Sequence, residues 1–321
     1  QDISCVGQCS LTVALPILSA AGMETCILPS AVLSPHTAGF TGFTVRDLTA
    51  DIPAIAAHWR KENIRFGAVY TGYLGSTEQI AYVQDIFATL LTEDGVTIVD
   101  PAMADNGKLY PAFDMDYARK NAGLCAQADM IVPNITEACF MTGSEYREEY
   151  GEEYIRDLIR KLSALGPKIA VLTGVSLSPG KTGVMGYDRE KDSWFSYQND
   201  RVDASYHGTG DLFSSACVGA VLRGLPLREA MIETLNQAFP TVITSGAMLS
   251  SAGFIIGFMT SNETISAIGL YLGAGTLMSI FLVMCVLPQI LLLGDTLIQK
   301  TSFTIEPSFR TVSRAGMMRI D

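Results

Sequence analysis

The chain has 321 residues, enough for one large domain or two, and 48% of them are hydrophobic, which is ample for a buried core. Its net charge of −11 and pI of about 4.8 argue against a nucleic-acid-binding surface. The excess of acidic residues lies before residue 239, and the rest of the chain carries equal numbers of acidic and basic residues, which predicts two unlike parts.

Apolar strands alternate with helices over the first 230 residues. We expect helices over 11–21, 52–62, 76–91, 152–165 and 211–223, and strands over 25–33, 66–70, 96–100, 130–132 and 169–173. Residues 183–187 and 194–197 alternate between apolar and polar side chains, as in a β-hairpin. This order predicts an α/β fold, in which a doubly wound, mostly parallel sheet carries helices on both faces.

Five polar residues fall at or just after the carboxyl ends of predicted strands, or at the start of a predicted helix. They are Tyr73, Asp100, Asn134, Thr173 and Asp211. Ligands of doubly wound sheets bind beyond the carboxyl ends of the strands. We therefore expect these five side chains to lie near one site.

The stretch from Gly208 through Thr209 and Gly210 to Asp211 resembles a glycine turn that feeds a helix. Two glycines let successive N–H groups point into one concavity, and the helix N-terminus adds its positive dipole end, so the turn suits a phosphate. A carboxylate at Asp211 would repel a bound phosphate, which favours a general base over an anion ligand. The alternative is that Asp211 merely caps the helix.

The same GTGD turn, followed by an apolar helix, resembles the signature of the ribokinase superfamily. Other stretches resemble its pyridoxal (pyridoxine/pyridoxamine) kinase branch: QDISCVG at 1–7, SPHT at 34–37, TGYLGS at 71–76, DPAMADNGKLY at 100–110 and PNITE at 133–137. The resemblance covers residues 1 to about 230. It implies ATP-dependent phosphorylation of the 5′-hydroxymethyl group of pyridoxal and its relatives, with Asp211 as general base. The hydroxymethylpyrimidine kinase branch shares GTGD and is the alternative.

Phosphoryl transfer needs a phosphate cradle, a metal ion and a positioned hydroxyl. Gly208, Thr209 and Gly210 offer the cradle, and we expect Asn134 and Thr173 to add phosphate contacts.

For the metal ion we expect Mg²⁺ at Asp100, Asp105 and Glu137, because it favours a few carboxylate oxygens and keeps bound waters. The resemblance supports Asn134 and Glu137 through the family's N-x-x-E element, and implies ATP and a monovalent cation. Asp100 has an alternative interpretation as an acid in a turn before Pro101.

The resemblance places the substrate ring near Asp2 and Ser4, near the His36-Thr37 loop, and near Tyr73. Many pyridoxal kinases have a serine directly after the first glutamine, whereas this chain has Asp2 there and Ser4 two residues later. Asp2 is suited to bind the ring hydroxyl or the protonated ring nitrogen. This departure leaves the preferred B6 vitamer open.

Two uncharged runs, 234–262 and 264–294, follow the kinase-like part, and each is long enough to span a bilayer. With the basic tail they resemble the C-terminal end of RND/MMPL-type exporters, and we expect two transmembrane-type helices in a segment over 231–321. Buried helices of a soluble domain are the alternative, and a fragmentary membrane transport component is a second functional hypothesis.

The resemblance also implies a strand before Gln1 and further kinase helices after residue 230, and we expect both to be missing from this chain. A fusion, a frameshift and an artefactual join near 224–236 remain open explanations. The seven cysteines are scattered without zinc-site spacing, so we expect them to be reduced and buried. For the kinase part we expect a cytoplasmic location and a homodimer, with membrane contact only through 234–294.

Overall fold

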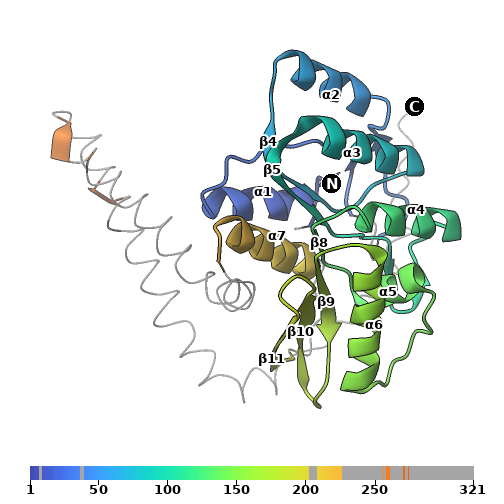
Figure 1. Cartoon of the computed structure of the whole chain (residues 1–321). Coiled ribbons are helices and arrows are strands. Elements are labelled where there is room, and N and C mark those ends of the chain that lie inside the picture. The colour runs from blue at the N-terminus through green and yellow to red at the C-terminus, as the bar shows by residue number, and fades with distance from the viewer. Residues whose placement is uncertain are drawn as a thin grey trace, which may run out of the picture. The chain divides into compact units, whose positions relative to one another are not determined.

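The computed structural model describes residues 1–6, 9–36, 40–201 and 208–225, together with the isolated residues 255, 258–260, 270–271 and 274. By its contacts the chain divides into two units, Gln1–Gln237 and Ala238–Asp321. All the helices and strands named below belong to the first unit (Figure 1).

Eighteen elements follow one another in the first unit. In chain order they are β1 (Ile3–Ser4), α1 (Leu11–Ala20), β2 (Ala31–Leu33), β3 (Val45–Asp47), α2 (Ile52–Lys61), β4 (Phe66–Thr71), α3 (Thr77–Leu90), β5 (Leu91–Val99), β6 (Ala104–Asp105), β7 (Lys108–Leu109), α4 (Met115–Cys125), β8 (Met130–Ile131), α5 (Ile135–Thr142), α6 (Glu152–Leu165), β9 (Ile169–Val175), β10 (Lys181–Asp188), β11 (Ser193–Asp200) and α7 (Thr209–Leu222).

The main sheet has six strands in the order β11-β10-β9-β8-β5-β4. The four strands β4, β5, β8 and β9 run parallel to one another, whereas β10 is antiparallel to both β9 and β11. The antiparallel pair is the predicted hairpin, because a short turn can join only antiparallel strands. The expected α/β sheet is therefore found, with a larger antiparallel share than the sequence suggested.

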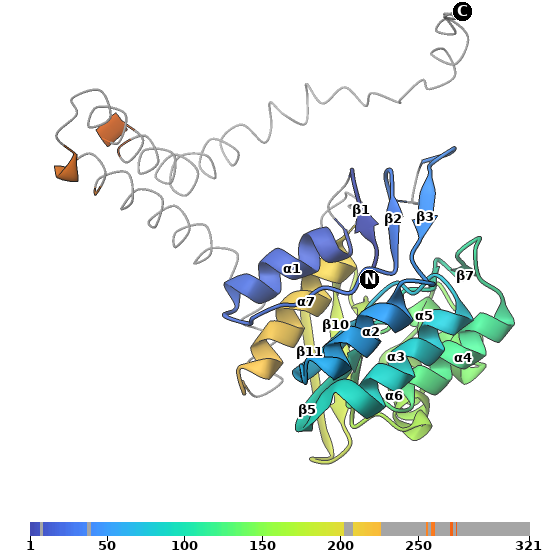
Figure 2. The same cartoon turned by 90° about the horizontal axis from the view of Figure 1, so that it is seen from above.

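Helices cover both faces of this sheet, as expected. Figure 2 shows α1 and α7 on one side and α2 to α6 on the other. Successive strand residues point to opposite faces, so Ile98 packs with α1 and α7 while Val99 packs with the other helices. Met130 likewise packs with α1 and α7, and Ile131 packs with the other helices. The buried strands thus contribute side chains to two cores, one on each face of the sheet.

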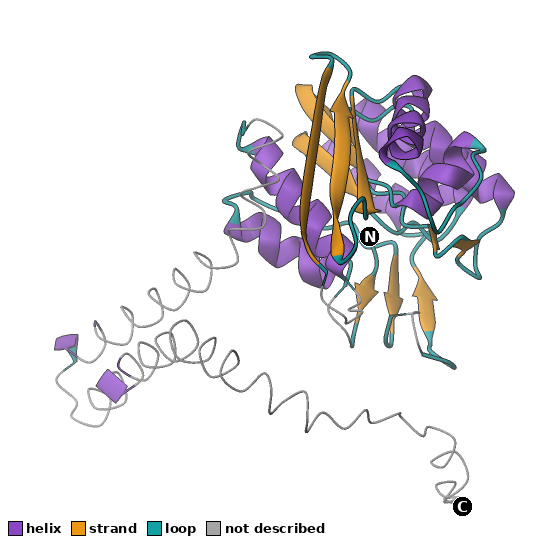
Figure 3. Cartoon of the chain, turned by 90° about the horizontal axis from the view of Figure 1, so that it is seen from below, coloured by secondary structure: helices purple, strands orange, loops and turns teal. Residues whose placement is uncertain are grey.

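A second, three-stranded sheet has the order β1-β2-β3 and stands apart from the main sheet (Figure 3). The strand expected over 25–33 is here only β2, and β3 with α4 and α5 had not been predicted as elements. The start of α4 carries a recognisable signal, since the side chain of Asp114 accepts a hydrogen bond from the N–H of Tyr117.

The cysteines differ from expectation in one respect. Among the described residues Cys9, Cys125 and Cys217 are buried and free, but Cys5 and Cys26 are exposed. Within the described part of the chain, no helix is long and apolar enough to cross a membrane. The two runs expected to do so, 234–262 and 264–294, lie almost wholly outside the described residues.

Candidate active site

Asp211 lies in the first turn of α7, and Gly208 is the residue that precedes the helix, with a left-handed backbone (φ +82°). The side chain of Asp211 turns to another element, because its Oδ2 accepts a hydrogen bond from the backbone N–H of Ser10 at 2.9 Å. Burial raises the pKa of Asp211 above the usual carboxyl value, and the Ser10 N–H opposes this rise. Gly208, and not Asp211, occupies the N-cap position of α7.

Two serines hold the carboxylate of Asp2. The Ser10 hydroxyl donates to Oδ1 at 2.5 Å, and the Ser4 hydroxyl donates to Oδ2 at 3.0 Å. Asp2, Ser4 and Ser10 are all at least nine-tenths buried. Ser10 thus joins Asp2 to Asp211, which brings an expected substrate residue next to the expected base.

Tyr73 belongs to the same neighbourhood. Burial raises the pKa of its hydroxyl, and the nearby charges of Asp2 and Asp47 raise it further. Its carbonyl accepts a hydrogen bond from the Ser30 hydroxyl at 3.0 Å, and its ring lies 5.6 Å from that of Phe113. The Tyr73 ring therefore packs on Phe113, and its hydroxyl lies within range of the charge of Asp2.

The loop after β2 is described only in part. The ring of His36 packs edge-to-face on Phe40, with centroids 5.1 Å apart. Thr37, the other expected substrate residue of this loop, lies outside the described residues. For these two residues substrate contact stays a prediction.

Asp100 follows the end of β5, as the sequence predicted. Its Oδ2 accepts a hydrogen bond from the Ser214 hydroxyl at 2.9 Å. Residues three apart on a helix share a face, so Ser214 and Asp211 present the same face of α7. Burial, together with the charges of Glu137 and Asp211, holds the pKa of Asp100 well above its usual range.

Glu137 and Asn134 form a capping box at the start of α5. The Asn134 side chain accepts from the Glu137 N–H, and the Glu137 side chain accepts from the Asn134 N–H, both at 2.9 Å. Glu137 also accepts from the N–H of Met103 at 2.9 Å. Burial nonetheless raises its pKa to about 7.

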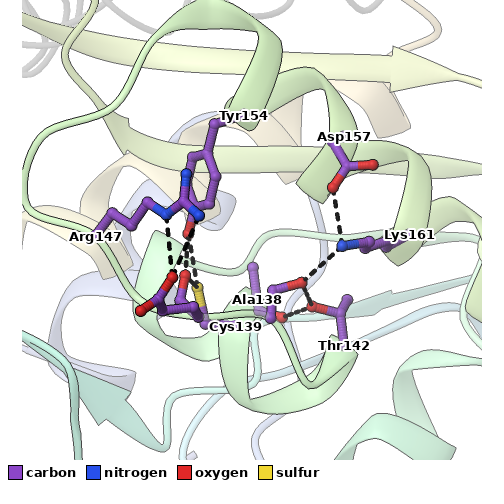
Figure 4. A network of polar contacts seen from close by, with 9 residues as sticks. Ala138, Cys139, Thr142, Arg147, Tyr154, Asp157 and Lys161 are labelled. Atoms are coloured by element: carbon purple, nitrogen blue, oxygen red, sulfur yellow. Dashed lines mark hydrogen bonds and ion pairs between the residues drawn. The ribbon is translucent and has the colours of Figure 1, made fainter.

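The helix that carries this pair is fastened to α6 at its other end (Figure 4). The Tyr154 hydroxyl lies 3.2 Å from the Cys139 sulfur and donates to the carbonyl of Glu145 at 2.7 Å. The Lys161 ammonium lies 3.3 Å from the Ser144 hydroxyl in the turn that follows α5. These contacts hold α5 in place, and with it Asn134 and Glu137.

Asp105 and Thr173, two further residues predicted for the site, lie at the edge of this group of side chains. Asp105 is exposed and accepts hydrogen bonds from Asn106, and Thr173 hydrogen-bonds to the carbonyl of Pro133 beside Asn134. Within the described residues no three His, Cys, Asp or Glu side chains are arranged to hold a metal ion. For Asp100, Asp105 and Glu137 a role in metal binding stays a prediction.

The cradle of the anion site is open. A Cβ placed on Gly210 would meet no atom within 4 Å, although Gly210 directly precedes the half-buried acid Asp211. Helix N-termini have backbone N–H groups without intrahelical partners, so this open space suits an anion. Gly208, Thr209 and Gly210 all lie at the start of α7, as the sequence predicted.

Two residues of the site were missed by the sequence analysis. Ser214 could have been found from its spacing to Asp211, because three residues make nearly one helical turn. Ser10 precedes α1 and reads as an ordinary N-cap, but its side chain makes no capping bond and instead binds Asp2. No local signal distinguishes the two roles.

Acidic side chains beyond the carboxyl ends of parallel strands, next to an open helix N-terminus, are the arrangement expected of an α/β enzyme whose ligand binds at this edge of the sheet. Comparison with known proteins gives the family. The phosphomethylpyrimidine kinase family matches residues 18–240, and the chain belongs to this family of pyridoxal and phosphomethylpyrimidine kinases.

Individual relatives agree. Pyridoxal kinase of Sus scrofa is 30% identical over 65% of this chain and 69% of its own length. The structure of pyridoxal kinase from Lactobacillus plantarum is 32% identical, with a TM-score of 0.67, over 76% of this chain and 87% of that chain. A structure from Bacteroides thetaiotaomicron, described as a phosphomethylpyrimidine kinase and crystallised with pyridoxal, is 33% identical with a TM-score of 0.70, over 87% and 93%.

These comparisons confirm the kinase family and the ribokinase-like fold expected from the sequence. They give no support to the expected exporter resemblance of residues 231–321. The chain is thus a kinase of this family, and its substrate is the open question.

Proposed function

We propose that the protein transfers the γ-phosphoryl group of ATP to the 5′-hydroxymethyl group of pyridoxal, pyridoxine or pyridoxamine. The observation that carries this proposal is the link from Asp211 through Ser10 to Asp2. It sets an acid at the anion site next to a buried acid suited to a heterocyclic substrate. Relatives named as pyridoxal kinases support this substrate class.

The reaction assigns one role to each part of the site. The β- and γ-phosphates bind at Gly208–Gly210, with Asn134 and Thr173 contributing further contacts. Asp211 accepts the proton of the substrate hydroxyl, while the oxygen of that hydroxyl forms a bond to the γ-phosphorus. The bond between that phosphorus and the bridging oxygen breaks, and the electron pair leaves with ADP. Product release then returns the proton from Asp211 to solvent.

The half-buried Asp100 and the buried Glu137 fit a divalent cation. Among the described residues neither has an ion-pair partner, and both have raised pKa values, which a nearby cation would offset. Mg²⁺ keeps several waters and binds substrate phosphates, so two carboxylates suffice, and Asp105 would act through water. When bound, the cation neutralises charge on the phosphates.

Substrate recognition falls to Asp2, Ser4 and Tyr73, and the resemblance to pyridoxal kinases adds His36 and Thr37 as further substrate contacts. The carboxylate of Asp2 is buried, and among the described residues two hydroxyl groups donate hydrogen bonds to it, so it can also accept a ligand that brings a positive charge or an N–H donor. A protonated pyridine nitrogen meets this need. Tyr73 offers an aromatic face to the ring.

A second candidate function is phosphorylation of hydroxymethylpyrimidine or its phosphate. The family match is described by this activity, and an aminopyrimidine would also bring N–H donors to Asp2. The two substrates differ in ring chemistry but use the same base and the same phosphate site.

Coupled ADP-release assays with pyridoxal, pyridoxine, pyridoxamine, hydroxymethylpyrimidine and its phosphate separate the two functions. The proposal predicts the highest kcat/KM with a B6 vitamer. Turnover of the pyrimidines alone would overturn it in favour of the second function. Turnover of none, by folded full-length protein with ATP and Mg²⁺, would reject both.

A further inference from the structure

Ser10 has a backbone conformation that serine rarely adopts. Its φ is +51° and its ψ is −129°, close to the first central position of a type II′ turn, where glycine dominates. A non-glycine residue in such a region is strained and persists only where its surroundings impose that conformation. The strain therefore needs a cause in the contacts of Ser10.

Those contacts lead to the two acids of the site. The hydroxyl donates to Oδ1 of Asp2 at 2.5 Å, and the backbone N–H donates to Oδ2 of Asp211 at 2.9 Å. Ser10 is 8% exposed, so water does not compete strongly for either bond. The direction of the N–H depends on the backbone angles, and the hydroxyl bond holds those angles.

Glycine would adopt this backbone conformation without strain, but it has no hydroxyl. Alanine would have neither the hydroxyl nor the freedom to remain at positive φ. Serine alone among these three residues combines a bond to Asp2 with an N–H directed at Asp211. The retained strain is thus explained by the double contact and not by helix capping, since Ser10 makes no side-chain capping bond to α1.

We propose that Ser10 is a positioning residue that aligns the general base Asp211 with the substrate-binding acid Asp2. The hydroxyl bond to Asp2 keeps the backbone strained, and the strained backbone aims the N–H at Asp211. This inference rests on the proposed function for its kinetic consequences. The hydrogen bonds and the conformation on which it stands do not depend on the identity of the substrate.

The test compares Ser10→Ala with Ser10→Gly in the full chain. Both variants lose the hydroxyl, so the KM for the vitamer rises in both, by about five- to tenfold for one hydrogen bond. Only Ser10→Ala is expected to relax to negative φ and turn its N–H away from Asp211. Its kcat should fall about tenfold or more, whereas the kcat of Ser10→Gly should fall less than about threefold.

Two controls make the comparison specific. Ser4→Ala removes the other hydroxyl on Asp2 without touching Asp211, so it should raise the KM for the vitamer with a small effect on kcat. The KM for ATP should stay within about twofold in all three variants, because none of them alters the phosphate cradle. A purely structural role for Ser10 would instead lower the stability and leave the kcat of the folded fraction unchanged.

Crystal structures of the two Ser10 variants test the same idea without activity. We expect residue 10 of Ser10→Gly to keep a positive φ with its N–H on Asp211, and residue 10 of Ser10→Ala to lose both. Retention of that bond in Ser10→Ala, or equal kcat in the two variants, would overturn the proposal. Should wild-type protein phosphorylate neither substrate class, the proposed function fails, and the crystal comparison still decides the role of Ser10.

Discussion

Asp211 is fixed by a residue from the opposite end of the kinase unit. Its carboxylate accepts the Ser10 N–H, and its pKa is raised by burial. A capping residue needs only a hydrogen-bond acceptor, but a general base must also take up a proton. The helix-cap and general-base interpretations of Asp211 can therefore be separated by a variant that accepts a hydrogen bond but does not bind a proton.

Asp211→Asn tests the base directly. Asparagine keeps the shape and still accepts the Ser10 N–H, but it does not take up a proton near neutral pH. We expect kcat to fall about 10²-fold or more with little change in ATP affinity. Steady-state kinetics and calorimetric ATP binding measure the two quantities. A kcat near the wild-type value in folded Asp211→Asn protein would remove Asp211 from the base role.

Gly210→Ala is the companion variant. Its Cβ would point into open space where the phosphate is expected, so ATP affinity should fall about tenfold, a loss typical of a crowded ligand contact. Thermal stability should be unchanged or slightly higher, because alanine favours a helix. ATP titration of the variant gives the answer, and unchanged affinity would place the phosphates elsewhere.

The pH dependence of kcat is a further expectation. A base works only when ionised, so activity is lost as pH falls through its pKa. Since burial raises the pKa of Asp211, the acid limb should lie above the ordinary carboxyl value of about 4. A kcat profile in saturating substrate reports this limb. An acid limb below the ordinary value would contradict the buried environment of Asp211.

Sequence reasoning pointed to the candidate site residues that carry local signals. Asp211 follows a glycine turn, and Asn134 and Glu137 have capping-box spacing. It missed Ser10 and Ser214, whose roles come from partners far away in the chain. Asp105, one of the three carboxylates predicted for the metal ion, is exposed in β6, which fits a contact through water, and its role stays a prediction.

Helices α1 and α7 approach each other closely, and a glycine permits this. A Cβ on Gly219 of α7 would lie 2.8 Å from the Cβ of Ala21, directly after α1. The two helices carry Ser10 and Asp211 at their starts. Their separation therefore controls the distance between these two residues.

Gly219→Ala should push the helices apart. Overpacking of this kind costs about 1–3 kcal/mol, more than the helix-propensity gain of up to about 1 kcal/mol. We expect a lower free energy of unfolding in urea and a lower kcat. Gly123→Ala, on the exposed side of α4 with no atom near its Cβ, is the matched control and should be neutral or stabilising. Equal free energies of unfolding for the two variants would show that α1 and α7 can move apart without loss of stability.

Among the individual elements, the long helices were predicted well from the sequence and the short strands poorly. Helix α6 begins and ends at the expected residues, since its apolar positions recur with helical spacing and Gly166 follows it. Of the strand expected over 25–33, only Ala31–Leu33 pairs, because apolar content alone does not provide a partner strand. The small sheet depends on contacts that no local pattern reveals.

For the whole molecule, the buried acids predict how stability responds to pH. Glu137 has a pKa of about 7 in the folded protein against an ordinary 4.5. Between these values the folded form holds a proton that the unfolded form lacks, so the free energy of unfolding should fall as pH rises from about 4.5 to about 7. Mg²⁺ should reduce this fall, because it favours the ionised acid.

Urea unfolding at pH 5, 6 and 7 in EDTA measures this slope, and Glu137→Gln is the variant to compare. Glutamine cannot ionise, so its slope should be shallower than that of the wild type, whatever its absolute stability. Addition of Mg²⁺ at pH 7 should stabilise the wild type more than the variant. Identical slopes would mean that Glu137 does not bind the proton in the folded state.

The Ser10–Asp211 contact spans 201 positions in the chain. A ribosome releases Asp2 and Ser10 well before Asp211, which lies on α7, the last helix among the described residues. At about 5–20 residues per second, the N-terminal acid waits on the order of ten to forty seconds for its partner. Nascent chains should therefore gain activity abruptly, only after α7 has left the exit tunnel.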